Sequence, residues 1–281
     1  MLRLGSKGFD QGFRAPEWNV FPCRTVPRLG VMDHRPLVLG HRGASAARPE
    51  NTLAAFAKAR ELGADGVELD ARKTADGWIV VHHDPQVDGF GLIVEHGYAE
   101  LRAVHPEIPT LVEALRACDG MVVNVEIKCL PWEPDADTPD RFAVHAVTEI
   151  VRGATRGNGS GSDFIVSSFD IGAIDACRGF APELVTGWLT SGQEVSVSAP
   201  VAIEHGHAWL NPDRVFALRA EKSGIAAAQE LGLRVNVWTV DEPADMSALA
   251  AAGVDGIITN VPDVAVATLS AAPGKGRRPK A

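Results

Sequence analysis

The fold is decided by residues 66–84, whose sequence is GVELDARKTADGWIVVHHD. The segments Gly66–Ala71 and Trp78–His83 both have strand-like patterns, and only five residues separate Arg72 from Trp78. Parallel neighbouring strands need a connection of about a dozen residues or more, whereas Asp76-Gly77 is a strong hairpin signal. We therefore expect the second segment to fold back antiparallel on the first.

Outward from this hairpin, short apolar runs alternate with Ala-rich amphipathic stretches, a pattern that predicts a parallel sheet covered by helices. With the hairpin strand set aside, the remaining strands predict an α/β fold, a TIM (β/α)8 barrel. Strands are expected at Leu37–His41, Gly66–Ala71, Met121–Ile127, Phe164–Phe169, Leu184–Leu189, Ala208–Leu210, Arg234–Val240 and Gly256–Thr259. Helices are expected at Asn51–Gly63, Leu111–Cys118, Arg141–Val151, Ile171–Gly179, Ala217–Leu231 and Ala244–Ala252.

The 281-residue chain has room for one barrel with short extensions, since such a barrel takes about 250 residues. Residues 1–35 are interrupted by Gly and Pro and show no apolar period, so we expect a loosely ordered N-terminal extension. Residues 36–270 are expected to form the single barrel domain. Residues 271–281 are rich in Lys, Arg and Pro and predict a disordered basic tail.

Charge and cysteine usage narrow the class of protein. The chain carries 36 acidic and 27 basic side chains, a net charge of −9, whereas nucleic-acid-binding proteins usually present a basic body. No run of 18 apolar residues occurs, so neither a transmembrane helix nor a stable membrane anchor is predicted. The four scattered cysteines are typical of reduced thiols in a cytoplasmic protein.

Residues that carry chemistry gather where the predicted strands end, which is where TIM barrels hold their active sites. His41-Arg42-Gly43 ends the first strand. Glu68 and Asp70 are two residues apart and share one face of the second strand. Asn124, Glu126 and Lys128 alternate along one face of the next parallel strand.

The hairpin returns His83 toward these carboxylates. A two-residue loop at Asp76-Gly77 would place His83 opposite Asp70, and a loop one residue earlier would place it opposite Glu68. In both registers His83, and not His82, lies on the carboxylate face, whereas a three-residue loop would reverse the choice. We interpret His83 as the site residue and His82 as packed or exposed.

Three carboxylates from two strands suit a hard divalent cation, so Glu68, Asp70 and Glu126 are predicted to bind one Mg²⁺ or Ca²⁺ ion. The lack of a Cys ligand there argues against a structural zinc. Arg42 and Lys128 lie near the same place and suit a phosphate oxygen. Histidines beside a metal-bound phosphate can move protons near neutral pH. The residues alone therefore predict metal-assisted phosphoester chemistry.

An ordered set of short motifs resembles the glycerophosphodiester phosphodiesterase family: His41-Arg42-Gly43, Pro49-Glu50-Asn51-Thr52, Glu68-x-Asp70, His83-Asp84-Pro85 and Glu126-x-Lys128. Val237–Val240 and Asp255–Asn260 are similar to that family too, so the resemblance covers about residues 37–268. It implies a TIM barrel that hydrolyses a small-molecule substrate, a glycerophosphodiester, to glycerol 3-phosphate and an alcohol.

The resemblance also implies roles for single residues. The family's general acid/base pair maps onto His41 and His83, and its metal ligands map onto Glu68, Asp70 and Glu126. The positions that match substrate or phosphate contacts are Arg42, Lys128, Glu50 and Trp238, of which Trp238 matches an aromatic wall of the pocket.

The same resemblance allows two nucleophiles, either water or the neighbouring glycerol hydroxyl, which would first form a cyclic phosphate. We interpret His83 as the acid that protonates the leaving alkoxide, since Asp84 and the hairpin could hold it rigidly. His41 is then the base. Asn51 is expected either to cap the first helix or to contact the site.

One departure from the family follows His83-Asp84, where only Pro85–Glu107 precede Ile-Pro-Thr-Leu and a longer insertion often builds a cap. Because of this shorter segment, the resemblance does not determine which alcohol head group the substrate carries. Two alternatives are a phospholipase D-like enzyme acting on lysophospholipids and a non-catalytic barrel that binds a phosphodiester or a partner protein. An amidohydrolase would show His-x-His at the first strand, where this chain has His41-Arg42-Gly43. The His205-Gly206-His207 segment precedes a predicted strand, so we expect it at the bottom of the barrel and not as a ligand pair.

Overall fold

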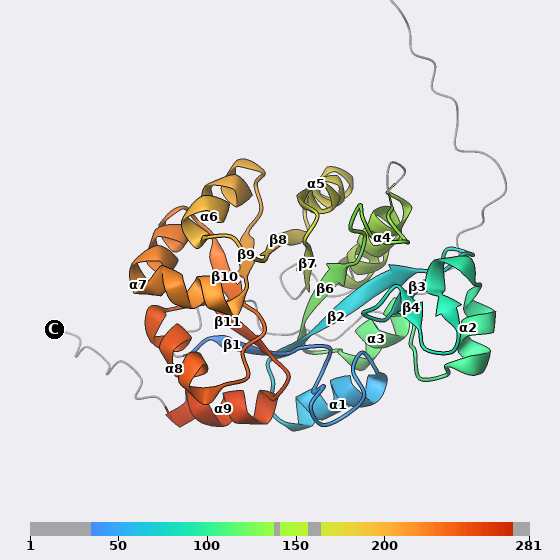
Figure 1. Ribbon diagram of the computed structural model, residues 1–281, viewed down its shortest axis with the longest axis horizontal. Coiled ribbons are helices and arrows are strands. Elements are labelled where there is room, and N and C mark those ends of the chain that lie inside the picture. The colour runs from blue at the N-terminus through green and yellow to red at the C-terminus, as the bar shows by residue number, and fades with distance from the viewer. Residues whose placement is uncertain (1–34, 138–140, 157–163, 272–281) are drawn as a thin grey trace, which may run out of the picture.

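The structure is a computed structural model that describes residues 35–137, 141–156 and 164–271. Within these ranges eight parallel strands close into a barrel, because β1 pairs with β2 on one side and with β11 on the other. The TIM-barrel prediction is confirmed, with helices around the outside of the strands (Figure 1). The order around the barrel is β1 (Leu37–Gly40), β2 (Gly66–Lys73), β6 (Val122–Ile127), β7 (Phe164–Ser168), β8 (Val185–Thr190), β9 (Trp209–Pro212), β10 (Arg234–Val237) and β11 (Gly256–Thr259).

Two of the outer helices, α6 and α9, were not expected from the sequence. The first turn of α6 alternates Val and Ser and its interior contains Pro200, which obscures a helical period. α9 is built mainly of small and apolar residues, so it shows little amphipathic contrast. The outer helices are α1 (Leu53–Glu61), α3 (Leu111–Ala117), α4 (Phe142–Arg156), α5 (Ile171–Phe180), α6 (Val195–Glu204), α7 (Arg214–Glu230), α8 (Pro243–Ala252) and α9 (Pro262–Ala271).

The inside of the barrel is apolar at one end and polar at the other. A cluster that includes Leu39, Val122, Ile165 and Trp209 fills the end where the strands begin. Asn124 follows Val122 on the same face of β6 and is fully buried, and Glu126 is the next residue on that face. Strand alternation therefore carries polar side chains toward the C-terminal ends of the strands, where a site would open.

The hairpin after β2 has a different loop from the one expected. β3 (Ile79–Val81) pairs antiparallel with β2, and Lys73 lies opposite Ile79. The loop has three residues instead of two, because the Thr74 amide donates to the Trp78 oxygen and Gly77 has a φ of +83°. A type I turn followed by a left-handed residue is the usual geometry of such loops, and Asp-Gly suits it as well as it suits a two-residue turn.

The short segment after His83 folds into a small unit beside β3 (Figure 1). It contains β4 (Gln86–Val87), β5 (Gly91–Leu92), a 3-10 turn (Ile93–Glu95) and α2 (Tyr98–Val104). Its apolar side chains pack together with one residue of β3, in a cluster made of Val80, Val87, Ile93, Leu101 and Ile108. Although short, the segment therefore has a core of its own.

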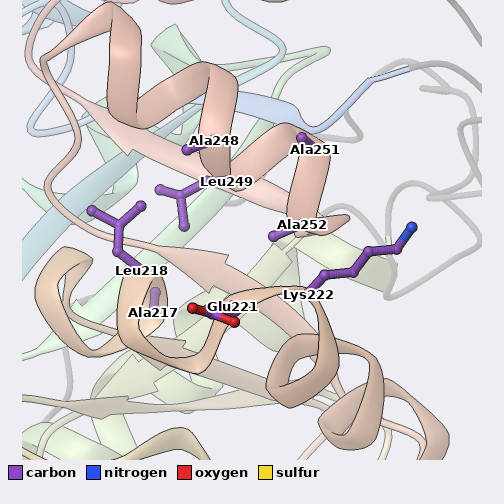
Figure 2. Close-up of a pocket in the computed structure, with 8 residues that line it drawn as sticks. All are labelled: Ala217, Leu218, Glu221, Lys222, Ala248, Leu249, Ala251 and Ala252. Atoms are coloured by element: carbon purple, nitrogen blue, oxygen red, sulfur yellow. The ribbon is translucent and has the colours of Figure 1, made fainter.

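A hollow of about 280 Å³ lies in the outer layer between α7 and α8 (Figure 2). Glu221, which has a φ of 51°, interrupts the helical geometry of α7 at this point. The hollow contains none of the site residues expected from the sequence. Its lining residues are Ala217, Leu218, Glu221, Lys222, Ala248, Leu249, Ala251 and Ala252.

The predicted extension and tail lie outside the described residues, apart from Arg35 and Ala271. In the part of the chain that the structure describes, every helix is too short or too polar to cross a membrane. Cys118, Cys129 and Cys177 are buried free thiols, and Cys23 lies outside the described ranges.

Candidate active site

Three buried carboxylates converge from neighbouring strands. Glu68 and Asp70 lie on β2 and Glu126 on β6, where the parallel register pairs Asp70 directly with Glu126. One oxygen from each of the three lies within 4.8 Å of the other two. One oxygen of Glu68, Oε1, is buried and has no hydrogen-bond partner among the described residues. Oxygen ligands in this arrangement fit a divalent cation such as Mg²⁺ or Ca²⁺.

Two cations hold the middle carboxylate. The Lys128 Nζ lies 3.0 Å from Asp70 Oδ1 and 2.6 Å from Glu126 Oε1, and the Arg42 Nε lies 3.4 Å from Asp70 Oδ2. Burial opposes the ionisation of Asp70, but Lys128 and Arg42 outweigh it and hold its pKa at about 2. Burial, together with its neighbour Asp70, raises the pKa of Glu68 to about 8. Burial also raises the pKa of Glu126, to about 7. The positive charges of Lys128 and Arg42 therefore do not fully compensate the burial of the three carboxylates.

The turn after β1 brings Arg42 to this cluster in a strained conformation. Arg42 has a φ of 54°, and its backbone amide donates to Glu68 Oε2 at 3.0 Å. Its guanidinium Nη1 donates to both oxygens of the half-exposed Glu50, at 2.9 and 3.0 Å. Left-handed non-glycine residues cluster at functional sites, and here the strain directs an amide and a guanidinium at the same site.

Asn51 contacts the site and does not cap the helix. It has a φ of 58°, and its Nδ2 donates to Asp70 Oδ2 at 2.8 Å. The cap of α1 is Thr52, whose hydroxyl accepts from the Ala55 amide. Of the two roles expected for Asn51, the structure therefore shows the site contact.

His41 lies at the end of β1, between the carboxylate cluster and a chain of polar groups. Its Nε2 is 4.0 Å from Glu68 Oε2, and its Nδ1 is 2.7 Å from Asn260 Oδ1. The Asn260 Nδ2 donates to Asp241 Oδ2 at 2.6 Å. Burial and the adjacent Arg42 lower the pKa of His41, although Asn260 acts in the opposite direction.

Asp241 fixes the direction of the hydrogen bonds that run from it through Asn260 to His41. A carboxylate only accepts hydrogen bonds, so the amide nitrogen of Asn260 must face Asp241 and the amide oxygen must face His41. The Asn260 oxygen can only accept, which means that the His41 Nδ1 carries the proton and donates. The His41 Nε2 then has a free lone pair on the side of Glu68. No role for Asp241 was predicted from the sequence, and none for Asn260 beyond its place in the family-like Asp255–Asn260 motif, because their role depends on contacts across the barrel.

His83 reaches the site although the strand register favours its neighbour. The three-residue loop pairs His82 with Asp70, and the His82 amide donates to the Asp70 carbonyl at 3.0 Å. β3 ends at Val81, so the alternation of side chains stops before either histidine. The His82 Nδ1 instead contacts the Asp84 carbonyl oxygen at 2.9 Å.

The charges of Asp84 and of the carboxylate cluster act on His83. Its Nδ1 lies 2.7 Å from Asp84 Oδ1. Burial and the charge of Lys128 lower its pKa, and the charge of Asp70 opposes them. His83 therefore lies within the electrostatic reach of the carboxylate cluster.

Trp238 and Phe169 form an aromatic pair beside the cations. Their ring centroids are 5.3 Å apart and nearly perpendicular, and the Trp238 Nε1 donates to the Asn211 carbonyl. The Lys128 Nζ lies 5.9 Å from the Phe169 ring centroid. Phe169, which ends a predicted strand, thus lies between Trp238 and Lys128.

Comparisons with known proteins show which family this chain resembles. Residues 41–264 match the family model described as the glycerophosphoryl diester phosphodiesterase family. A glycerophosphodiester phosphodiesterase from Caldanaerobacter subterraneus is 31% identical over 249 residues, which cover 82% of this chain and 96% of the relative. The crystal structure of a glycerophosphodiester phosphodiesterase from Thermotoga maritima superposes with a TM-score of 0.70 at 29% identity, covering 83% of this chain and 98% of that one.

A further structure shares the fold. It is an Oleispira antarctica phosphodiesterase in complex with the product sn-glycerol-3-phosphate, with a TM-score of 0.73 and 24% identity. The match covers 84% of this chain and 98% of that one.

Proposed function

The chain belongs to the glycerophosphoryl diester phosphodiesterase family, enzymes that hydrolyse glycerophosphodiesters, and we propose that it does so with one divalent cation and two histidines. The observation that carries this proposal is the convergence of Glu68, Asp70 and Glu126 within 4.8 Å. These residues would hold the cation, which when bound would neutralise charge on the phosphate and polarise it for attack.

The proposed substrate yields glycerol 3-phosphate and an alcohol. The complex of the Oleispira phosphodiesterase with sn-glycerol-3-phosphate supports this product class. In this chain Arg42 and Lys128 supply the positive charge that a phosphate oxygen needs. Glu50 orients the Arg42 guanidinium through two hydrogen bonds. Trp238, packed on Phe169, supplies an apolar wall beside these cations.

His41 is proposed as the general base. The Asp241–Asn260 pair keeps the proton on its Nδ1, so the Nε2 lone pair can accept a proton from the nucleophile. Its lowered pKa keeps the imidazole unprotonated near neutral pH. The nucleophile is either water or the neighbouring glycerol hydroxyl.

His83 is proposed as the general acid. The Asp84 carboxylate accepts from its Nδ1 and opposes the lowering of its pKa by burial and Lys128, and the Nε2 of the protonated ring would donate a proton to the leaving alkoxide. Arg72 holds the backbone of His83 through a hydrogen bond from its Nε to the His83 oxygen. The two histidines therefore have different partners, and this difference separates their roles.

The test is the release of glycerol 3-phosphate from a panel of glycerophosphodiesters, with and without a chelator. We expect release from at least one substrate, loss of release on chelation, and recovery with added Mg²⁺ or Ca²⁺. Full activity in the chelated enzyme would contradict the role of the cation. Activity in the Glu126→Gln variant equal to that of the native enzyme would contradict the ligand assignment.

A further inference from the structure

A second cluster of metal-ligating side chains lies at the opposite end of the barrel from the carboxylates. Asp175 belongs to α5, and His205 and His207 flank the turn between α6 and β9. One ligand atom from each lies within 4.8 Å of the other two. The Asp175 carboxylate faces both rings, with Oδ2 2.8 Å from His205 Nδ1 and Oδ1 3.3 Å from His207 Nε2.

The backbone of the turn brings the two rings to the same side. Gly206, between them, has a φ of +75°, and a Cβ there would lie 2.5 Å from the Arg178 side chain. The His205 and His207 rings are nearly parallel, 17° apart in angle, with centroids separated by 6.1 Å. Arg178, on α5, also donates a hydrogen bond to the His205 backbone oxygen. The left-handed φ favours glycine at position 206, since a side chain there would be strained.

His207 offers a buried ring nitrogen. Its side chain is fully buried, and its Nδ1 lies 2.9 Å from the Thr186 hydroxyl. The other ring nitrogen, Nε2, makes no hydrogen bond of good geometry among the described residues, and it faces Asp175 Oδ1 at 3.3 Å. Histidines that bind metals are characteristically held by a hydrogen bond to the second ring nitrogen, and Thr186 occupies that place here.

We propose that Asp175, His205 and His207 bind one divalent transition-metal ion, zinc being the ion that fits best. Two imidazoles and one carboxylate are a ligand set that zinc takes with a water in the fourth position. Ligands about 2.1 Å from a tetrahedral ion lie roughly 3.4 Å from one another, close to the 3.3 Å between Asp175 Oδ1 and His207 Nε2. The ion would link α5 to the α6–β9 turn and stabilise the end of the barrel that holds no catalytic residue.

The composition of the cluster separates it from the carboxylate site. It offers two imidazoles and a single carboxylate, so Mg²⁺ and Ca²⁺, which prefer several oxygen ligands, are disfavoured. Imidazole nitrogens keep a high affinity for zinc in such surroundings. Excess Mg²⁺ should therefore leave this site free for zinc.

The experiment counts zinc ions bound to the full chain by equilibrium dialysis, with excess Mg²⁺ in every sample. His205→Ala and Asp175→Ala should each bind one zinc ion fewer per chain than the native protein. Both side chains are about one third exposed, so these variants keep the core intact. The matched control is His96→Ala, which removes a histidine that faces one carboxylate, that of Glu100 at 3.3 Å, and should keep the native zinc count.

Cobalt provides an independent readout. Co²⁺ should give a ligand-field absorption band in the native protein, and the band should be lost in His205→Ala and kept in His96→Ala and Glu126→Gln. A native zinc count in either His205→Ala or Asp175→Ala would overturn the proposal and leave the cluster as a hydrogen-bonded network. Since neither readout uses phosphodiesterase activity, the result is independent of the proposed function.

Discussion

Arg72 donates a hydrogen bond from its Nε to the backbone oxygen of His83, 2.7 Å away, although its side chain is almost completely buried. Through Nη1 the same guanidinium pairs with Asp135 at 2.5 Å and with Glu133 at 3.1 Å. One side chain on β2 therefore holds the segment that carries His83 and the loop that follows Lys128.

Replacing Arg72 with Met should lower both stability and kcat. The change leaves the buried Asp135 carboxylate without its partner, and breaking a buried ion pair costs about 3–5 kcal/mol. Urea denaturation measures the loss of stability, and steady-state assays measure kcat. The control is Arg60→Met on the surface of α1, which loses hydrogen bonds to two backbone oxygens and should cost much less. Equal stability of the two variants would contradict the role of Arg72.

The alternation of strand and helix patterns, together with the lengths of the connections between strands, made most of the fold predictable from the sequence. Five residues between Arg72 and Trp78 could not form a parallel crossover, and the remaining strands matched a barrel. The loop length was not predictable, because Asp76-Gly77 fits a two-residue turn and also a three-residue turn with Gly77 in the left-handed region. One residue of loop length decides which histidine pairs with Asp70.

The carboxylates of the site were predictable because strand alternation places Glu68, Asp70 and Glu126 on one face. The side chains that orient the site residues were not predictable. Asp241 contacts His41 only through Asn260, and Arg72 reaches Asp135 across 63 residues of sequence. Such contacts depend on the closed barrel, which brings together residues far apart in the sequence.

The Glu126→Gln substitution should weaken the binding of Mg²⁺ or Ca²⁺ by about tenfold or more. Cation affinity depends strongly on the number of charged oxygen ligands, and the change removes one of three. Calorimetry on chelated protein measures this affinity. Glu61→Gln serves as the control, because Glu61 is exposed on α1 and pairs with Lys58. A native affinity in Glu126→Gln would exclude Glu126 from the ligand set.

Cation binding should release protons below about pH 8 and strengthen as the pH rises. In the cation-free protein burial raises the pKa of Glu68 to about 8 and that of Glu126 to about 7, so both bind protons at pH 6. Only the deprotonated oxygens ligate, and the cation must displace those protons. Affinity should therefore rise from pH 6 to pH 8 and level off above. Calorimetry at pH 6.5 in buffers of different ionisation enthalpy measures the release, and an equal heat in all of them would contradict it.

The Asp241→Asn substitution should lower kcat while leaving cation affinity unchanged, with the about 10²–10⁴-fold contributed by a positioned base as its upper limit. An amide at position 241 can donate as well as accept, so the Asn260 amide is free to rotate and the His41 Nδ1 loses its fixed acceptor. The base would then spend part of its time in the wrong tautomer, and positioned acid–base groups contribute about that factor. A native kcat would show that the Asp241–Asn260 pair has no part in orienting His41. A loss of cation affinity would instead point to a general disturbance of the site.

The two histidines should differ in their response to the leaving group. His41→Ala and His83→Ala should each lose about 10²–10⁴-fold in kcat on a glycerophosphodiester of a simple alcohol, with cation affinity retained. A nitrophenyl ester has a leaving group that hardly needs protonation, so it should rescue the variant that lacks the acid. With the His41 Nδ1 proton held by Asn260 and His83 beside Asp84, we expect rescue of His83→Ala only. Rescue of His41→Ala alone would exchange the roles, and near-native activity of both variants on the simple ester would refute the two-histidine mechanism.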